Sequence, residues 1–256
     1  MRILTCNIRF GSADDGEDSW PLRRDLCARV IHTQDADIIC FQEMQADQHA
    51  WLCAQLEGYA AYAMTDQPAG TNPQNAIYYR QARYRQISAG GYWLSRTPHV
   101  PGTKSWGSDC VRLANWVLLQ DAQYGISLRV VNTHFDHIGQ LAREQQASLI
   151  VEDAQAYAPA FPQLLTGDLN CDTRNPAIAI LRAGGWRDSY AAVHGDDDPG
   201  CTYHGFMGES FPSDLGKIDW IMARGQLEVR DAWIVRDSRD GRYPSDHYFV
   251  GADIAL

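Results

Sequence analysis

The stretch Pro162-Gln163-Leu164-Leu165-Thr166-Gly167-Asp168-Leu169-Asn170 joins an apolar run to two polar residues that stand two positions apart. If the strand predicted by this run continues through Gly167, the two-residue repeat of a strand puts Asp168 and Asn170 on the same side at its end. A carboxylate and a carboxamide in that position suit the holding of a metal-bound water against a phosphorus atom. For this stretch alone, a strand followed by an Asx-turn is the better interpretation. A functional interpretation gains support because other predicted strands also end in polar residues of this kind.

Outward from this strand, apolar alternation and helical spacing predict strands and helices along the whole chain. Further strands are predicted at residues 2–10, 36–41, 59–64, 76–80, 84–94, 114–120, 127–133, 217–222, 228–235 and 247–252. Helices are predicted at about 19–33, 46–56, 140–157 and 176–183, and an acidic loop at 196–200. Because no internal repeat, low-complexity tract or linker interrupts this pattern, we expect one domain over residues 1–256.

The charge of the chain limits the classes of partner. It has 22 basic and 32 acidic residues, a net charge of −10. Proteins that bind long nucleic acid neutralise many phosphates with Lys and Arg, so long duplexes are disfavoured and a small or short phosphoester fits better. Part of the acidity would suit a site for a hard cation, because such cations prefer oxygen ligands.

Hydrophobicity and cysteine content bear on the compartment. No apolar run approaches the length of a membrane-spanning helix, and the N-terminal residues are too polar for a signal peptide. The seven cysteines include no CxxC pair, and Cys6, Cys40 and Cys171 stand in or beside apolar runs that are typical of buried thiols. We therefore expect a cytoplasmic protein in a reducing compartment, without membrane insertion, a zinc cluster or an obligate protein partner.

Polar residues of the metal-binding or acid–base type stand at the ends of several predicted strands. The set comprises Asn7, Glu43, His134, Asp168 with Asn170, Asp219 and the pair Asp246-His247. Taken singly, each has a structural explanation as a turn residue, an acidic helix start, a core histidine or a cap. Their shared position after apolar strands favours function, because strand ends in a layered fold can converge on one cleft.

The same positions carry a resemblance to a known superfamily. The motifs are Cys6-Asn7-Ile8-Arg9, Phe41-Gln42-Glu43, Asn132-Thr133-His134, Thr166-Gly167-Asp168-Leu169-Asn170, Lys217-Ile218-Asp219-Trp220 and Pro244-Ser245-Asp246-His247. In this order, and over nearly the whole chain, they resemble the endonuclease/exonuclease/phosphatase superfamily. The stretches 92–98 and 202–206 look like a bacterial branch related to the deadenylase-like group. The chain departs from that branch at Pro73-Gln74, where Gly-Glu is frequent.

The resemblance implies a fold and a metal. The fold is α/β, a four-layer α/β/β/α sandwich of the DNase I-like type, with two packed mixed sheets and helices on the outer faces. Glu43 looks like the principal ligand of Mg²⁺, for which Mn²⁺ is a possible substitute. Asn7 would support the metal or a phosphate oxygen, and Asp246 would contact a metal.

The resemblance also implies catalytic roles. Asp168 would orient or deprotonate the attacking water, and Asn170 would hold that water or a phosphate oxygen in line. His247 would act on the phosphoryl group, and Asp219 would accept its other ring N–H and set the tautomer. His134 would donate to a non-bridging oxygen.

Substrate-binding candidates are Arg112, Arg143 and His204, although a surface charge is the alternative for the two arginines and a supporting position for His204. We expect Mg²⁺-dependent, nuclease-like hydrolysis of a phosphodiester, with short single-stranded nucleic acid or a small phosphorylated molecule as substrate. The first alternative is a phosphatase or phosphodiesterase for a small-molecule or lipid-headgroup phosphate. A non-catalytic binding relative is the second, and the intact set of candidate catalytic residues argues against it.

Overall fold

Two six-stranded sheets form the centre of the computed structural model, which describes residues 1–67, 69–195 and 199–256. The first sheet has the order β11-β12-β1-β2-β4-β3, made of Glu228–Val235, Phe249–Ala255, Arg2–Asn7, Ile38–Gln42, Ile77–Arg80 and Tyr59–Tyr62. The second has the order β5-β6-β7-β8-β10-β9, made of Tyr84–Trp93, Leu113–Asp121, Ser127–His134, Gln163–Asp168, Asp219–Arg224 and Arg187–Asp188. Both sheets are mixed, because β1 pairs with β2 and β7 with β8 in parallel while their other neighbours are antiparallel.

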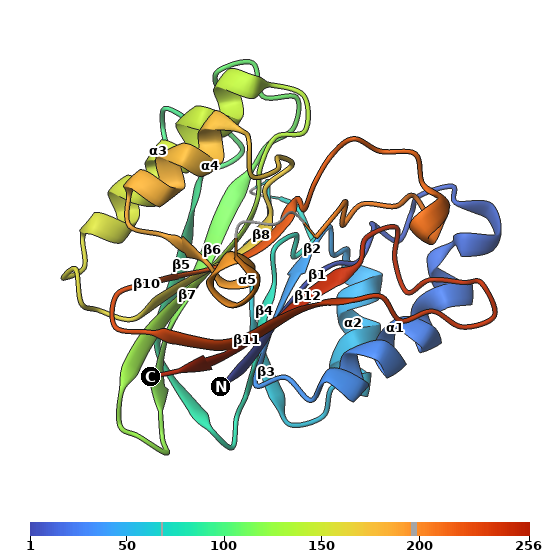
Figure 1. Ribbon diagram of the computed structural model, residues 1–256, viewed down its shortest axis with the longest axis horizontal. Helices are drawn as coiled ribbons and strands as arrows, with labels where there is room; N and C mark the ends of the chain where they lie inside the picture. The colour runs from blue at the N-terminus through green and yellow to red at the C-terminus, as the bar shows by residue number, and fades with distance from the viewer. Residues whose placement is uncertain (68, 196–198) are drawn as a thin grey trace.

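Helices cover the outer faces of the two sheets. The helices α1 (Trp20–Gln34) and α2 (Ala46–Gln55) lie on one side of the molecule, and α3 (Gln140–Gln155) and α4 (Pro176–Ala183) lie on the opposite side (Figure 1). The short helix α5 (Ser189–His194) lies beside β10 and β11. This arrangement confirms the predicted four-layer α/β/β/α sandwich.

Apolar side chains fill each space between the layers. Ile38 and Leu164 belong to the core between the sheets, Phe41 to the core under α1 and α2, and Trp186 to the core under α3 and α4. Strands such as β8 are therefore buried on both faces, and every residue from 163 to 168 is buried. This double burial explains why the strand has adjacent apolar residues, Leu164 and Leu165, instead of a clean alternation.

Gly167 lets β8 approach its parallel neighbour β7. Its φ angle is 146°, and a Cβ atom at this position would overlap the carbonyl oxygen of Thr133. A side chain of any size would therefore push the end of β8 away from β7. The glycine sets the position of Asp168, the last residue of the strand.

The predicted elements are present, and the structure adds two 3₁₀ helices, η1 (Gly16–Asp18) and η2 (Gly208–Ser210), a short strand and a short α-helix. Arg187–Asp188 and Ser189–His194 form β9 and α5, which are too short to show a periodic pattern in the sequence. Residues 196–198 of the expected acidic loop lie outside the described residues. Among the described residues, no helix combines the length and apolar character needed to cross a membrane.

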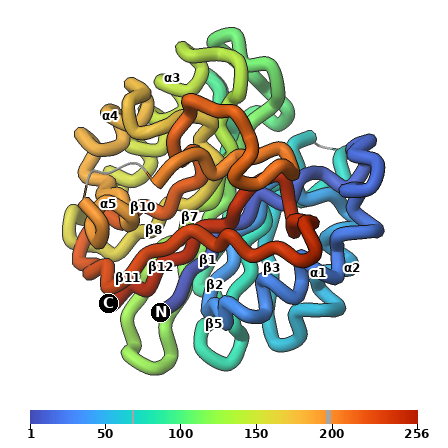
Figure 2. The backbone as a smooth tube through the Cα atoms, turned by 45° about the vertical axis from the view of Figure 1, so that its right-hand side comes forward, coloured from blue at the N-terminus to red at the C-terminus, as the bar shows by residue number. Residues whose placement is uncertain are grey.

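Polar side chains join the two sheets near one edge of the sandwich. Gln42 on β2 donates from Nε2 to Oδ1 of Asn132 on β7, at 2.7 Å. Asn7, at the end of β1, donates to Asp168, at the end of β8. The opposite edge holds the chain termini, where the first and last strands run side by side (Figure 2). The carboxyl ends of the parallel strands from both sheets thus meet at one rim.

Candidate active site

Four of the predicted strand-end residues meet around the amide of Asn7. Its Nδ2 donates to Oδ2 of Asp168 at 3.0 Å and to Oε1 of Glu43 at 3.3 Å, and it lies 3.4 Å from Nε2 of His247. Glu43 follows β2 and His247 precedes β12, so the group combines residues from both sheets. The expected convergence of these side chains on one cleft is present in the structure.

His247 and Asp219 form a buried pair beside this group. Nδ1 of His247 lies 2.9 Å from Oδ2 of Asp219, and Oγ1 of Thr202 donates to the same carboxylate oxygen at 2.6 Å. Burial alone would lower the pKa of His247, but the charges of Asp219 and Asp168 outweigh it and raise that pKa well above its ordinary value. His247 is therefore an imidazolium whose Nε2 lies 3.8 Å from Oδ2 of Asp168.

A left-handed turn, not strand alternation, brings Asn170 beside Asp168. The strand β8 ends at Asp168, Asn170 has a φ angle of 49°, and its backbone N–H donates to Oδ1 of Asp168 at 2.8 Å. The strand continues through Gly167, as predicted, but it ends at Asp168, and the Asx-turn of the alternative interpretation follows it. The turn still places both side chains at the site. Burial and the neighbouring Asp219 raise the pKa of Asp168 to about 7.

His134, at the end of β7, is a neutral imidazole. Burial and the positive charge of Arg112 lower its pKa well below the ordinary value. Its Nε2 lies 2.9 Å from Nδ2 of Asn170, which also donates to the carbonyl oxygen of Phe135 at 3.0 Å. An Nε2 atom that accepts from Asn170 has no hydrogen to give, so the expected donation from His134 to a phosphate oxygen needs a different tautomer or contact.

Two carboxylates offer hard oxygen ligands for a divalent cation. Glu43 has a φ angle of 63°, and its Oε2 accepts from the backbone N–H of Phe10 at 3.1 Å. Burial, together with the negative charge of Glu43 and against the opposing charge of His247, raises the pKa of Asp246. Two carboxylates in one site repel each other, and a cation relieves that repulsion. The donor set therefore fits a divalent metal.

Asn7, the third expected metal ligand, turns its amide oxygen away from the two carboxylates. Oδ1 of Asn7 accepts from the backbone N–H of Arg9 at 3.1 Å, so its Nδ2 faces the carboxylates. In this arrangement Asn7 holds Glu43 and Asp168 instead of offering an oxygen to a cation. Asp168, Asp219 and His247 also lie close enough to share an ion, but a protonated His247 has no free lone pair for one.

Glu43, Asp168 and His247 line a pocket of about 780 Å³, and Asn7 and Asp219 stand behind its wall. Basic residues from three segments also line it, namely Arg9, Lys104 and Arg112. The wall further includes Glu43, Gln45, Asp66, Gln67, Gln74, Asp109, Cys110, His134, His137, Asp168, Asn170, Tyr203, Asp246 and His247. The pocket therefore combines cationic groups for an anion with many carboxylates and amides.

The substrate-binding candidates have different positions. Arg112 lines the pocket, whereas Arg143 donates to the carbonyl oxygen of Asp136 and to Oε1 of Gln140, at 2.9 and 2.8 Å. His204 is only 1% exposed and packs against aromatic rings. Neither Arg143 nor His204 is among the described residues that line the pocket. His204 is turned away from the pocket, whereas its neighbour Tyr203 lines it, so the position of His204 agrees with its alternative, supporting role.

Three residues at the site are not among the sequence candidates. Arg9 has a φ angle of 54° and pairs with Asp246 at 3.7 Å, Thr202 supports Asp219, and the ring of Tyr203 packs edge-on against His247 at 5.0 Å. All three stand in motif stretches, but a motif does not give the direction of a side chain in a loop.

A protein-family model agrees with this geometry. The model of the Endonuclease/Exonuclease/phosphatase family matches residues 4–247. The chain therefore belongs to that family, whose members are phosphoester hydrolases, and the resemblance predicted from the motifs is confirmed. No curated protein sequence matches the chain.

Solved structures with the same fold cover the whole of this chain. An endonuclease/exonuclease/phosphatase from Bacteroides vulgatus has 28% identity and a TM-score of 0.89, over 100% of this chain and 98% of its own. A mannosyl-6-phosphatase from Bacteroides thetaiotaomicron VPI-5482 has 26% identity and a TM-score of 0.89, over 100% of both chains. The human Nocturnin catalytic domain with bound sulfate has 20% identity and a TM-score of 0.76, over 100% and 94%, and shares the fold.

Proposed function

We propose that this chain is a Mg²⁺-dependent phosphoesterase that hydrolyses its substrate by attack of a water molecule. The observation that carries the proposal is the contact of His247 with Asp219, which places Nε2 of His247 3.8 Å from Oδ2 of Asp168 at the pocket. Glu43 and Asp246 would hold the cation. When bound, the cation supplies positive charge for the phosphoryl oxygens, in a reaction that depends mainly on positioning and electrostatics.

The remaining steps are assigned to side chains. Asp168 has a pKa of about 7, which suits a base that takes a proton from the attacking water near neutral pH. The side-chain amide of Asn7 donates a hydrogen bond to the Asp168 carboxylate and holds it in place. Asn170 also lines the pocket. His247 presents its Nε2–H to a phosphoryl oxygen, and Asp219 stabilises the imidazolium.

The first candidate substrate is a small phosphorylated molecule with a polar body, such as a sugar phosphate. The net charge of −10 and the carboxylates in the wall disfavour a long polyanion. The amides of Gln45, Gln67 and Gln74 in the wall suit hydroxyl groups. Similarity to a mannosyl-6-phosphatase over both full chains supports the same class.

The second candidate is a short phosphodiester, the substrate that the deadenylase-like motifs predict. Arg9, Lys104 and Arg112 in the pocket wall could each meet a phosphate. Because only these few basic side chains face the pocket, binding of such a substrate should depend only weakly on salt concentration. A steep dependence, as for proteins that neutralise many phosphates, would contradict this candidate.

A substrate panel tests the proposal. We expect Mg²⁺-dependent phosphate release from hexose phosphates to exceed that from a nucleotide monoester, and cleavage of short RNA, DNA and sphingomyelin to be slower. Asp168→Asn should lose at least about 100-fold in kcat, a typical contribution of general acid–base catalysis. The exposed Asp237→Asn is the matched control. Full activity in excess chelator, or an active Asp168→Asn enzyme, would overturn the proposal, and preferred cleavage of RNA would favour the second candidate.

A further inference from the structure

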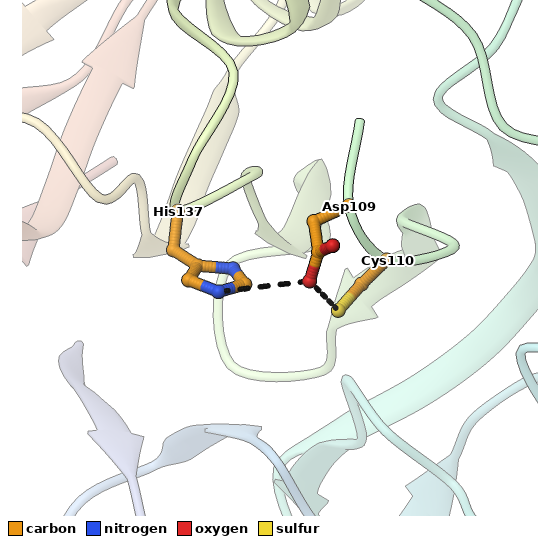
Figure 3. Close-up of side chains that lie close together, drawn as sticks. All are labelled: Asp109, Cys110 and His137. Atoms are coloured by element: carbon orange, nitrogen blue, oxygen red, sulfur yellow. Dashed lines mark hydrogen bonds and ion pairs between the residues drawn. The ribbon is translucent and has the colours of Figure 1, made fainter. Parts of the chain in front are cut away.

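A second group of metal-type side chains lies in the wall of the same pocket. Asp109, Cys110 and His137 point toward one another (Figure 3), and one ligand atom from each lies within 4.8 Å of the others. Oδ2 of Asp109 is 3.6 Å from Sγ of Cys110 and 3.8 Å from Nε2 of His137. We propose that these three side chains form a Zn²⁺ site, separate from the Mg²⁺ ligands Glu43 and Asp246.

The separations are close to those that a zinc ion requires. Zn–S bonds of about 2.3 Å and Zn–O and Zn–N bonds of about 2.1 Å, at tetrahedral angles, put sulfur about 3.6 Å from oxygen and nitrogen about 3.4 Å from oxygen. The Cys110–Asp109 separation already has that value, the His137–Asp109 separation exceeds its value by a few tenths of an ångström, and all three ligand atoms lie within 4.8 Å of one another. All three residues lie at the surface of the pocket, where a small adjustment disturbs no core packing.

One buried carboxylate holds both segments that carry these ligands. Oδ1 of Asp136 accepts from the backbone N–H groups of Asp109 and Cys110, at 2.8 and 3.3 Å. Its Oδ2 accepts from the N–H of Gly139 at 2.6 Å, in the segment that contains His137. Asp136 is fully buried. The loop at 108–110 and the segment after β7 are therefore fixed relative to each other before any metal binds, which lowers the ordering cost of binding.

The donor set selects the ion. A thiolate and an imidazole favour Zn²⁺, whereas Mg²⁺ prefers oxygen ligands and keeps its waters. Three protein ligands leave one position for water, and on binding Cys110 gives up its thiol proton. The sequence did not reveal this site, because Cys110 is not part of a CxxC pair and His137 stands 27 positions away.

Metal binding at this site would also affect Arg112, a candidate substrate-binding residue. Nη2 of Arg112 donates to Nδ1 of His137 at 3.4 Å. When Nε2 of a neutral His137 binds a metal, the ring hydrogen occupies Nδ1, which then cannot accept from Arg112. Occupation of the zinc site therefore releases the Arg112 guanidinium within the pocket.

Cobalt titration tests the site without any measurement of activity, so its outcome is independent of the proposed function. Chelator-treated protein in excess Mg²⁺ is titrated with Co²⁺, which reports thiolate ligation by a charge-transfer band in the near ultraviolet. We expect the band to saturate at about one Co²⁺ per chain and to be bleached by Zn²⁺. Cys110→Ser should abolish the band. His137→Gln should weaken Co²⁺ binding at least about tenfold, since even outer-shell changes cost that much.

Cys53→Ser is the matched control. Cys53 is also exposed and lies 3.7 Å from Nε2 of His49, but the described residues give it no third ligand. This variant should keep the band. An absent band in the wild-type protein, a band that persists in folded Cys110→Ser, or loss of the band in Cys53→Ser would overturn the proposal; circular dichroism verifies folding of each variant.

Discussion

Nδ1 of His247 lies 2.9 Å from Oδ2 of Asp219, and this contact bridges the two sheets of the sandwich. Asp219 is the first residue of β10 in the second sheet, and His247 lies just before β12 in the first. Both side chains are buried, at 1% and 5% exposure. A buried ion pair is sensitive to the loss of either partner, because the remaining charge is left without compensation.

Replacement of Asp219 tests the role of this pair. Asp219→Asn should lower kcat by about 10²–10⁴, because the amide neither stabilises the imidazolium nor sets its tautomer. The KM should change less, since Asp219 does not line the pocket. Steady-state kinetics on the best substrate of the panel measure both constants. A kcat close to that of the wild-type enzyme would remove the pair from the mechanism.

Removal of a metal ligand should raise the Mg²⁺ concentration that the enzyme needs for activity. In Glu43→Gln we expect the Mg²⁺ concentration for half-maximal activity to rise by at least about tenfold, because a neutral amide is a weaker ligand than a carboxylate. Activity measured over a Mg²⁺ series gives this value, and Mn²⁺ should partly replace Mg²⁺. The exposed Glu228→Gln is the control. Equal Mg²⁺ curves for the Glu43 variant and the wild-type enzyme would contradict the assignment.

The glycine before Asp168 should be intolerant of any side chain. Gly167→Ala should reduce the free energy of unfolding by about 2–5 kcal/mol, because the new methyl group overlaps Thr133 and forces β8 from β7. Gly125→Ala is the control: it has a positive φ of 69° but no atom within 4 Å of the added Cβ. Urea unfolding compares the two. Similar losses of unfolding free energy in the two variants would show that the positive φ angle, not the close approach to Thr133, makes residue 167 intolerant of a side chain.

Asp172 should link stability to pH. Burial alone would raise its pKa, but hydrogen bonds from the side chain and backbone of Arg174 outweigh burial and lower that pKa. A lowered folded-state pKa means that the carboxylate stabilises the fold above its ordinary pKa of about 3.9, and that this stability is lost as pH falls through the folded value.

Asp172→Asn should therefore be less stable than the wild-type protein by about 1–3 kcal/mol near neutral pH. The difference should shrink at a pH well below about 3.9, because the wild-type carboxyl group is protonated as pH falls through its lowered folded-state pKa. Chemical unfolding at both pH values measures it, with Asp237→Asn as an exposed control. A difference that does not change with pH would show that the charge of Asp172 is not the cause.

Much of the fold could be predicted because its central strands are buried on both faces. Adjacent apolar residues in β1, β2 and β8 mark such strands without reference to distant residues. β9 and α5 could not be predicted in this way, since two and six residues contain no measurable period. Their conformation depends on the neighbouring β10 and β11.

The site was predictable where residues end strands and unpredictable where they lie in loops. Asn7, Asp168 and His134 end strands, so the end of the sheet places them. His204 stands in a recognisable motif, yet the loop turns it inward against Tyr248 at a ring distance of 4.1 Å. Arg143 lies on a helix, and hydrogen bonds to its own segment hold it away from the pocket.

By itself, the sequence determined the layers, the family and the chemical types of the groups at the strand ends, because burial and motif spacing are local properties of the chain. Only the tertiary structure decided that His247 meets Asp219, that Asn7 turns its amide nitrogen toward the carboxylates, and that Cys110 lies beside His137. These contacts join residues distant in the chain, and their direction follows from how two sheets pack and how one buried carboxylate, Asp136, holds two loops together.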